Sequence, residues 1–109
     1  MTIYELVALL KETGYPVAHS HFKNTKDSPA LAPPFIVYIT PETDNFIADN
    51  RVYTKVQNVN VELYTSNKDP QAEEVLEGLF DDNDIPYDAY QVYIDSEQLF
   101  QKTYEIGVI

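Results

Sequence analysis

The sequence contains no cysteine, which excludes disulfide bonds, thiolate metal ligands and a cysteine nucleophile. Glycine occurs only three times, at Gly14, Gly78 and Gly107, so no glycine-rich phosphate-binding loop is present. No apolar run approaches the roughly 18 residues that a membrane-spanning helix requires. We therefore expect a soluble protein that makes no use of a membrane.

Basic residues are also scarce. Seven lysines and arginines oppose eighteen acidic residues, giving a formal net charge of −11. The basic residues are spread along the whole chain, so no patch is expected to hold a phosphate backbone. We predict no tight binding to nucleic acid. The acidity serves either solubility alone or a surface that passes close to nucleic acid without binding it.

Known catalytic and metal-binding patterns are missing as well. There is no G-x-S-x-G turn and no zincin helix. His19 and His21 would share one face of a strand, but no third zinc ligand can be placed beside them. The acidic run 81–84 lacks the glycine and glutamate of a calcium loop, because Pro86 and Val92 stand at those positions. We expect no enzyme activity, no metal and no cofactor.

With 109 residues the chain is predicted to form one domain, spanning 1–109. The first residues carry no basic stretch followed by an apolar run, which a secretory signal would require. Synthesis inside the cell is therefore expected.

A helix is predicted over Thr2–Thr13. Thr2 and Glu5 have the spacing of a capping box. Gly14 and Pro16 then provide an ending and a residue that does not continue the helix. Its apolar stripe comprises Ile3, Leu6, Val7 and Leu10.

The longest alternating stretch predicts a strand buried on one face, with Val59, Val61 and Leu63 inward. The compact run 35–39 predicts a central strand, and a polar segment joins the two as an extended β-hairpin. Before residue 35, we expect a short strand over 17–22 and an exposed loop over 24–34. Because the apolar positions change parity near Gln57, a bulge is expected there.

A second helix is predicted over Pro70–Asp82. Asp69 is suited to cap it, and Pro70 fits the first helical position. Its apolar stripe comprises Ala72, Val75, Leu76, Leu79 and Phe80. Strands over 87–94 and 98–107 follow, joined as a hairpin.

Together these elements predict an α+β fold in which two helices pack on one side of a mainly antiparallel sheet with an extended β-hairpin. The sheet should include 35–40, 52–65, 87–94 and 98–107. The expected core comprises Leu6, Leu10, Ile36, Val61, Leu63, Leu76, Leu79, Phe80 and Ile106.

Nine tyrosines are more than a domain of this size readily buries. Tyr38 and Tyr104 are assigned to sheet packing. Four others are interface candidates, namely Tyr53, Tyr64, Tyr87 and Tyr90. Phe46 and Ile47 lie among charged and amide residues at the hairpin tip, so we expect them outside the core as a docking site.

Several segments carry a family resemblance. They are Asn45-Phe46-Ile47-Ala48-Asp49-Asn50-Arg51-Val52-Tyr53, Val61-Glu62-Leu63-Tyr64-Thr65, Lys68-Asp69-Pro70, Ile85-Pro86-Tyr87-Asp88 and Ser96-Glu97-Gln98-Leu99-Phe100-Gln101-Lys102-Thr103-Tyr104-Glu105-Ile106. In this layout the chain resembles small head-tail joining proteins of tailed phages and prophages from Gram-positive hosts, and most of all the tail-terminator, or tail-completion, type.

The resemblance implies a structural virion assembly protein that forms a homo-oligomeric, hexameric ring. It implies tail-tube and head-connector proteins as partners, and a location in the host cytoplasm before the head-tail junction of the virion. The oligomer and docking interface is assigned to Phe46, Ile47, Asp49, Asn50, Arg51, Tyr53, Tyr64, Tyr87 and Tyr90. The alternative is an acidic regulatory binding protein of the DNA-mimic type.

Overall fold

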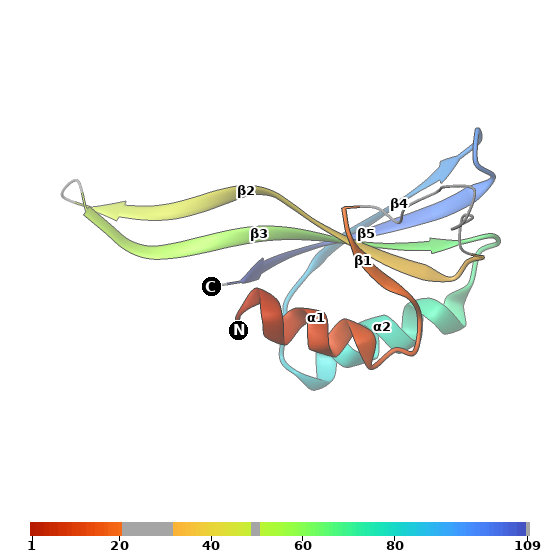
Figure 1. The fold of residues 1–109 in the computed structure, drawn as a ribbon, viewed down its shortest axis with the longest axis horizontal. Helices are drawn as coiled ribbons and strands as arrows, with labels where there is room; N and C mark the ends of the chain where they lie inside the picture. The colour runs from red at the N-terminus through yellow and green to blue at the C-terminus, as the bar shows by residue number, and fades with distance from the viewer. Residues whose placement is uncertain (21–31, 49–50, 109) are drawn as a thin grey trace.

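The structure is a computed structural model that describes residues 1–20, 32–48 and 51–108; for 41–48 and 51–56 it describes the backbone alone. The described chain forms α1 (Ile3–Lys11), β1 (Val17–His19), β2 (Phe35–Ala48), β3 (Arg51–Thr65), α2 (Pro70–Asp82), β4 (Asp88–Ile94) and β5 (Leu99–Val108). Both helices lie on the same side of the sheet (Figure 1). The predicted α+β class is therefore confirmed.

The strands form one sheet in the order β1-β2-β3-β5-β4. Only β1 and β2 pair in parallel; the other three described pairs are antiparallel. After β3 the chain crosses through α2 to the far edge, forms β4, and returns as β5 between β3 and β4. The crossover places α2 over β5, because a helix that connects two strands of one sheet must lie on its face.

Strands β2 and β3 continue well beyond the rest of the sheet. They pair from Phe35–Tyr64 to Ala48–Arg51, whereas β5 pairs with β3 only over 57–65 and β1 pairs with β2 only over 36–38. We call the two-stranded part, residues 39–48 and 51–56, the arm. The arm gives the molecule a long axis of 50 Å against 32 and 25 Å (Figure 1). It confirms the predicted extended hairpin.

The predicted bulge near Gln57 is wrong in position. β3 pairs with β5 without interruption from Gln57 onward. The irregularity lies on β2, where Thr40 and Pro41 together stand opposite Val59. Proline has no amide hydrogen for the ladder, so a strand tolerates it at a bulge. A second register shift places Tyr53 as the extra residue on β3.

The predicted capping box is present at the start of α1. The Thr2 side chain accepts a hydrogen bond from the Glu5 amide at 3.2 Å, and the Glu5 carboxylate accepts one from the Thr2 amide. The helix ends at Lys11, before the predicted Thr13, and Gly14 follows with φ +85°. At that φ a side chain would strain the backbone, which explains the glycine.

Helix α2 has the predicted bounds and cap, since Asp69 Oδ1 accepts a hydrogen bond from the Ala72 amide at 3.1 Å. Its inward face differs from the predicted stripe. Val75 is 37% exposed, and the acidic Glu73 is buried instead. The helix is rotated so that two glutamates one turn apart meet β5, where Lys102 accommodates them.

The core lies between the helices and the sheet. Of the predicted core, all but Leu79 is buried, and Leu79 is half-buried. The buried cluster comprises Leu6, Leu10, Ile36, Val59, Val61, Leu63, Ala72, Leu76, Phe80, Ile85, Tyr104, Ile106 and Val108. Tyr104 is fully buried, which confirms its packing role. The opposite face of the sheet has no described helix over it.

Candidate functional site

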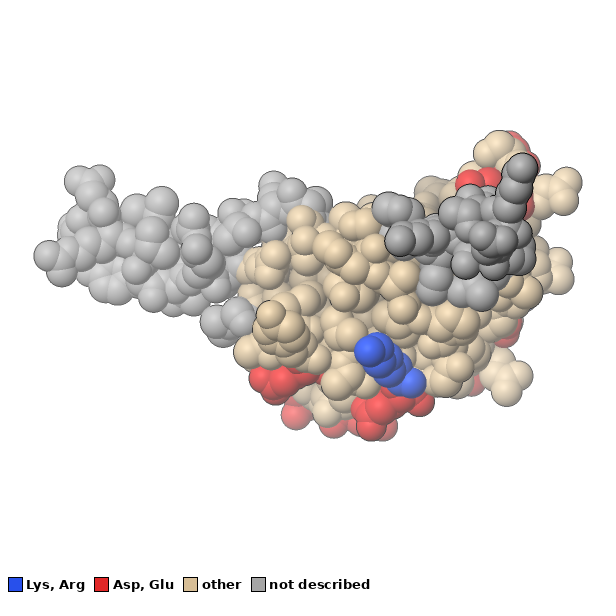
Figure 2. Space-filling model, viewed as in Figure 1, with Lys and Arg blue, Asp and Glu red and all other residues tan. Residues whose placement is uncertain are grey.

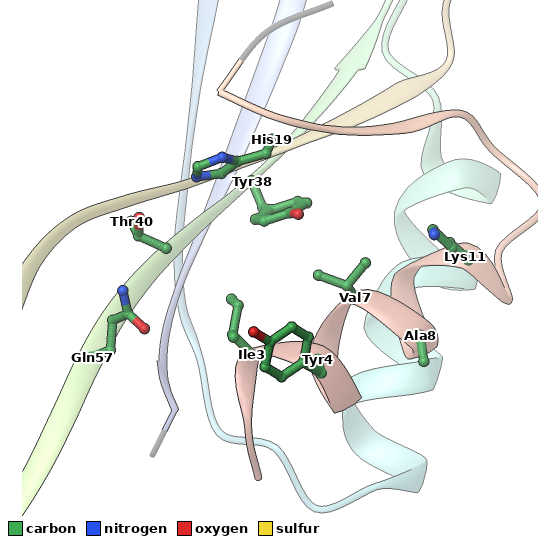
Figure 3. A pocket seen from close by; sticks show the side chains of 9 residues that line it. All are labelled: Ile3, Tyr4, Val7, Ala8, Lys11, His19, Tyr38, Thr40 and Gln57. Carbon is green, nitrogen blue, oxygen red and sulfur yellow. The ribbon is translucent and has the colours of Figure 1, made fainter.

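A groove of about 500 Å³ lies where α1 meets the root of the arm (Figure 3). It exists because α1 has only nine residues, whereas the strands beneath it continue outward. The helix therefore leaves the sheet uncovered at the point where the arm begins. The residues that line the groove are Ile3, Tyr4, Val7, Ala8, Lys11, His19, Tyr38, Thr40 and Gln57.

The groove has a helical wall and a sheet floor. His19, Tyr38, Thr40 and Gln57 come from three adjacent strands, and the register places His19 directly beside Tyr38. The rings of these two residues are tilted against each other with centroids 5.0 Å apart. In Figure 3 the side chains of Ile3 and Val7 point from α1 toward the ring of Tyr38, and Lys11 lies apart at the other end of the groove from Gln57. Paired aromatic rings give the floor a defined, mostly apolar surface.

Tyr4 and Lys11 distinguish the wall. Tyr4 is 83% exposed, a large aromatic ring that packs little against its own chain. Lys11 is the one lysine, arginine, aspartate or glutamate among the residues that line the groove. In Figure 2 acidic side chains gather along the lower margin of the molecule, while uncharged groups cover the centre. The groove is thus apolar and slightly basic in a chain of net charge −11.

A second group of polar side chains lies between α2 and β5. Lys102 Nζ is 2.8 Å from Glu73 Oε1 and 3.0 Å from Glu77 Oε2. Lys68 Nζ is 2.7 Å from Glu73 Oε2, and the Tyr104 hydroxyl donates to Glu77 Oε2 at 2.7 Å. Every charge in the group has an opposite partner, so the group joins α2 to the sheet.

The pKa values in this group follow from burial opposed by pairing. Burial raises the pKa of Glu73, but hydrogen bonds from Lys102 and Lys68 outweigh it and leave that pKa lowered. Burial also raises the pKa of Glu77, and hydrogen bonds from Tyr104 and Lys102 again lower it overall. For Lys102 burial lowers the pKa, yet its two carboxylate partners raise it overall. The ionised forms are therefore the stable ones here.

On the opposite face of the sheet, β2, β3 and β4 present aromatic residues. The rings of Phe35 and Tyr64 stack with centroids 5.0 Å apart. The Tyr64 hydroxyl donates to Glu62 Oε1 at 2.9 Å, and burial is the main cause that raises the pKa of Glu62. Tyr90 is 50% exposed on the same face. Within the described chain no strand pairs with the outer edge of β4.

The structure separates the residues predicted for the interface. Tyr64 and Tyr90 lie on the face without helices, whereas Tyr87 packs against the rings of Phe80 and Tyr104 at 5.4 and 5.3 Å. Tyr87 is therefore assigned to packing within the chain. The backbone of the arm contains Phe46, Ile47, Arg51 and Tyr53, whose side chains lie outside the described part. Asp49 and Asn50 lie outside the described residues altogether.

Sequence reasoning missed the groove. Tyr4 and Lys11 fall off the apolar stripe of α1, and nothing in their spacing relates them to Tyr38. A weak signal was present, because Tyr4 is a large aromatic residue in the first turn of the predicted helix and off its apolar stripe, where the core cannot use it. The two histidines predicted to share a face are only half described: His19 lines the groove, and His21 lies outside the described residues.

In the described ranges no three histidine, aspartate or glutamate side chains come together as a metal site. No described helix is long and apolar enough to span a membrane. Neither a protein-family model nor a curated protein matches the sequence.

The pairing of Glu73 and Glu77 predicts how stability responds to acid. Because their folded pKa values are lowered, the unfolded state binds protons more readily, so stability falls as pH drops below the ordinary glutamate pKa of about 4.3. Lys102→Met removes one of the groups that lower the pKa values of Glu73 and Glu77. The loss of stability at acidic pH should therefore be smaller in this variant than in the parent. Urea unfolding at a series of acidic pH values measures it.

Glu62→Gln is the control for that experiment. The pKa of Glu62 is raised in the folded protein, so the ionised carboxylate destabilises the fold at pH values above the ordinary glutamate pKa. Removing this carboxylate should therefore raise the free energy of unfolding at neutral pH. If Lys102→Met kept the parent's full acid dependence, the charge group would have no part in it.

Proposed function

We propose that this chain is a non-enzymatic virion assembly protein, a tail terminator that forms a ring, caps the tail and docks it to the head connector. The arm is the observation that carries the proposal. A two-stranded ribbon is marginally stable in water, and unpaired strand edges favour association with another chain. An arm of this kind is suited to a chain that completes its packing only on assembly.

The resemblance to head-tail joining proteins suggests that this assembly takes place at the head-tail junction. Three features of the chain are consistent with such a role. The body is compact, the arm projects from it, and the face without helices carries Tyr64 and Tyr90. Tyrosine is favoured on surfaces that are wet before assembly and buried after it. A head-to-tail contact between identical copies closes into a ring when the rotation permits.

The DNA-mimic alternative requires many evenly spaced carboxylates on the surface. Glu73 and Glu77 instead face β5 and are paired with lysines. These inward acids interrupt the acidic stretch of α2. The geometry therefore favours assembly over mimicry.

The net charge predicts the behaviour of the ring toward DNA. Six copies carry 6 × −11 = −66 formal charges, so a DNA strand in the channel would slide without binding. The purified protein should show no measurable affinity for duplex DNA at physiological salt in a fluorescence anisotropy titration. Micromolar binding that weakens steeply with added salt would overturn this expectation.

The proposed function is tested by deleting the coding sequence from the phage or prophage that carries it and examining the lysate by electron microscopy. We expect DNA-filled heads and separate, unjoined tails, and restoration of whole particles when the chain is supplied from a plasmid. Normal infectious particles from the deletion would refute the proposed function.

A further inference from the structure

We propose that the groove between α1 and the root of the arm receives the arm tip, residues 43–50, of a second copy of the chain. The inference rests on the proposed function, because it specifies how neighbouring copies in the ring hold one another. The tip of one copy would fill the groove of the next, whose own tip would fill the groove after it. This contact is heterologous, so it repeats around a ring.

The two surfaces are complementary in chemistry. The groove offers the rings of Tyr4 and Tyr38, the aliphatic wall of Val7, and the positive charge of Lys11. The tip sequence offers Phe46 and Ile47 between acidic residues at positions 44 and 49. The apolar pair of the tip would be buried against the apolar groove, and the acidic residues of the tip would pair with Lys11.

The geometry requires that tip and groove belong to different copies. Thr40 stands at the groove, and Ala48 is the last described residue of β2, eight residues further along the same strand. At about 3.3 Å per residue, the backbone of the arm lies roughly 20 Å from Thr40 at Phe46 and roughly 26 Å from it at Ala48. Figure 1 shows the arm directed away from α1. The chain therefore presents donor and acceptor at separate places, as a head-to-tail contact needs.

The absence of native cysteine makes a crosslinking test direct. Asn45→Cys, a polar tip position beside the apolar pair, is mixed with Ala8→Cys, since Ala8 is exposed and lines the groove. Asn45→Cys is mixed in parallel with Glu74→Cys, an exposed position on α2 away from the groove. Under mild oxidation the first mixture should form the mixed disulfide at least about tenfold faster, because docked thiols react at a raised effective concentration.

A further variant shows whether the groove itself is responsible. Tyr4→Ser, added to the Ala8→Cys chain, removes an exposed ring and should leave the monomer folded. It should bring the rate of mixed disulfide formation down toward that of the Glu74→Cys control. Thermal unfolding of each variant chain, measured separately, confirms that each is folded.

The outcomes separate this inference from the proposed function. Equal rates with Ala8→Cys and Glu74→Cys, or a rate that Tyr4→Ser does not change, would overturn the tip-in-groove contact. If rings were still found by light scattering, the proposed function would stand with a different contact. Lack of joining defects in the deletion strain would refute the proposed function whatever the crosslinking rates.

Discussion

The double variant Phe46→Ser with Ile47→Ser should abolish the joining of heads to tails while leaving the isolated monomer's free energy of unfolding within about 0.5 kcal/mol of the parent's. The tip lies at the end of the arm, beyond the stretch in which β1 and β5 flank the sheet. Because we propose that Phe46 and Ile47 leave water only on assembly, loss of these apolar groups should weaken assembly and spare folding. Complementation of the deletion strain measures joining, and urea unfolding at low protein concentration measures stability.

Val75→Ser is the matched control for that result. Val75 is an exposed apolar residue on α2, distant in sequence from the arm. Its replacement should leave both joining and stability near the parent's. Normal infectious particles from the arm variant would remove the tip from the mechanism, and a strongly destabilised monomer would show that Phe46 and Ile47 serve the core.

Leu76→Ala should lower the free energy of unfolding by about 2–5 kcal/mol, the range for emptying a packed site. Leu76 is fully buried between α2 and the sheet, within the cluster that includes Leu6 and Phe80. Its neighbour Val75 is 37% exposed, so Val75→Ala should cost no more than about 1 kcal/mol. The pair of adjacent substitutions therefore reports the orientation of α2.

Urea unfolding of the two variants distinguishes the structure from the sequence-based stripe, which placed both residues inward. Similar losses for Leu76→Ala and Val75→Ala would mean that the helix is rotated from the orientation described.

The elements could be predicted because their signals are local. Thr2 with Glu5, and Asp69 with Pro70, mark helix starts within four residues of chain, and the alternation of Val59, Val61 and Leu63 marks a strand. The face of α2 could not be predicted in the same way. Glu73 and Glu77 turn inward because a lysine on β5, 29 residues from Glu73, pairs with both of them. The local hydrophobicity of the helix sequence does not indicate that pairing.

The bulge and the groove depend on relations between elements. Parity of apolar positions along β3 suggested an irregularity, but only the pairing shows that the extra residue belongs to β2, beside Pro41. The groove arises from a difference in length between α1 and the strands beneath it. Sequence patterns predict the length of the helix and of each strand separately. They do not indicate where the end of the helix lies relative to the ends of the strands.

The mass of the assembled species tests the ring most directly. Purified protein is followed by size-exclusion chromatography with light scattering over a wide concentration range. The account predicts one discrete species of about six times the mass of a single chain at high concentration, since a closed head-to-tail contact stops growing when the ring is complete. A mass that stays at one or two chains throughout, or that increases without limit, would contradict it.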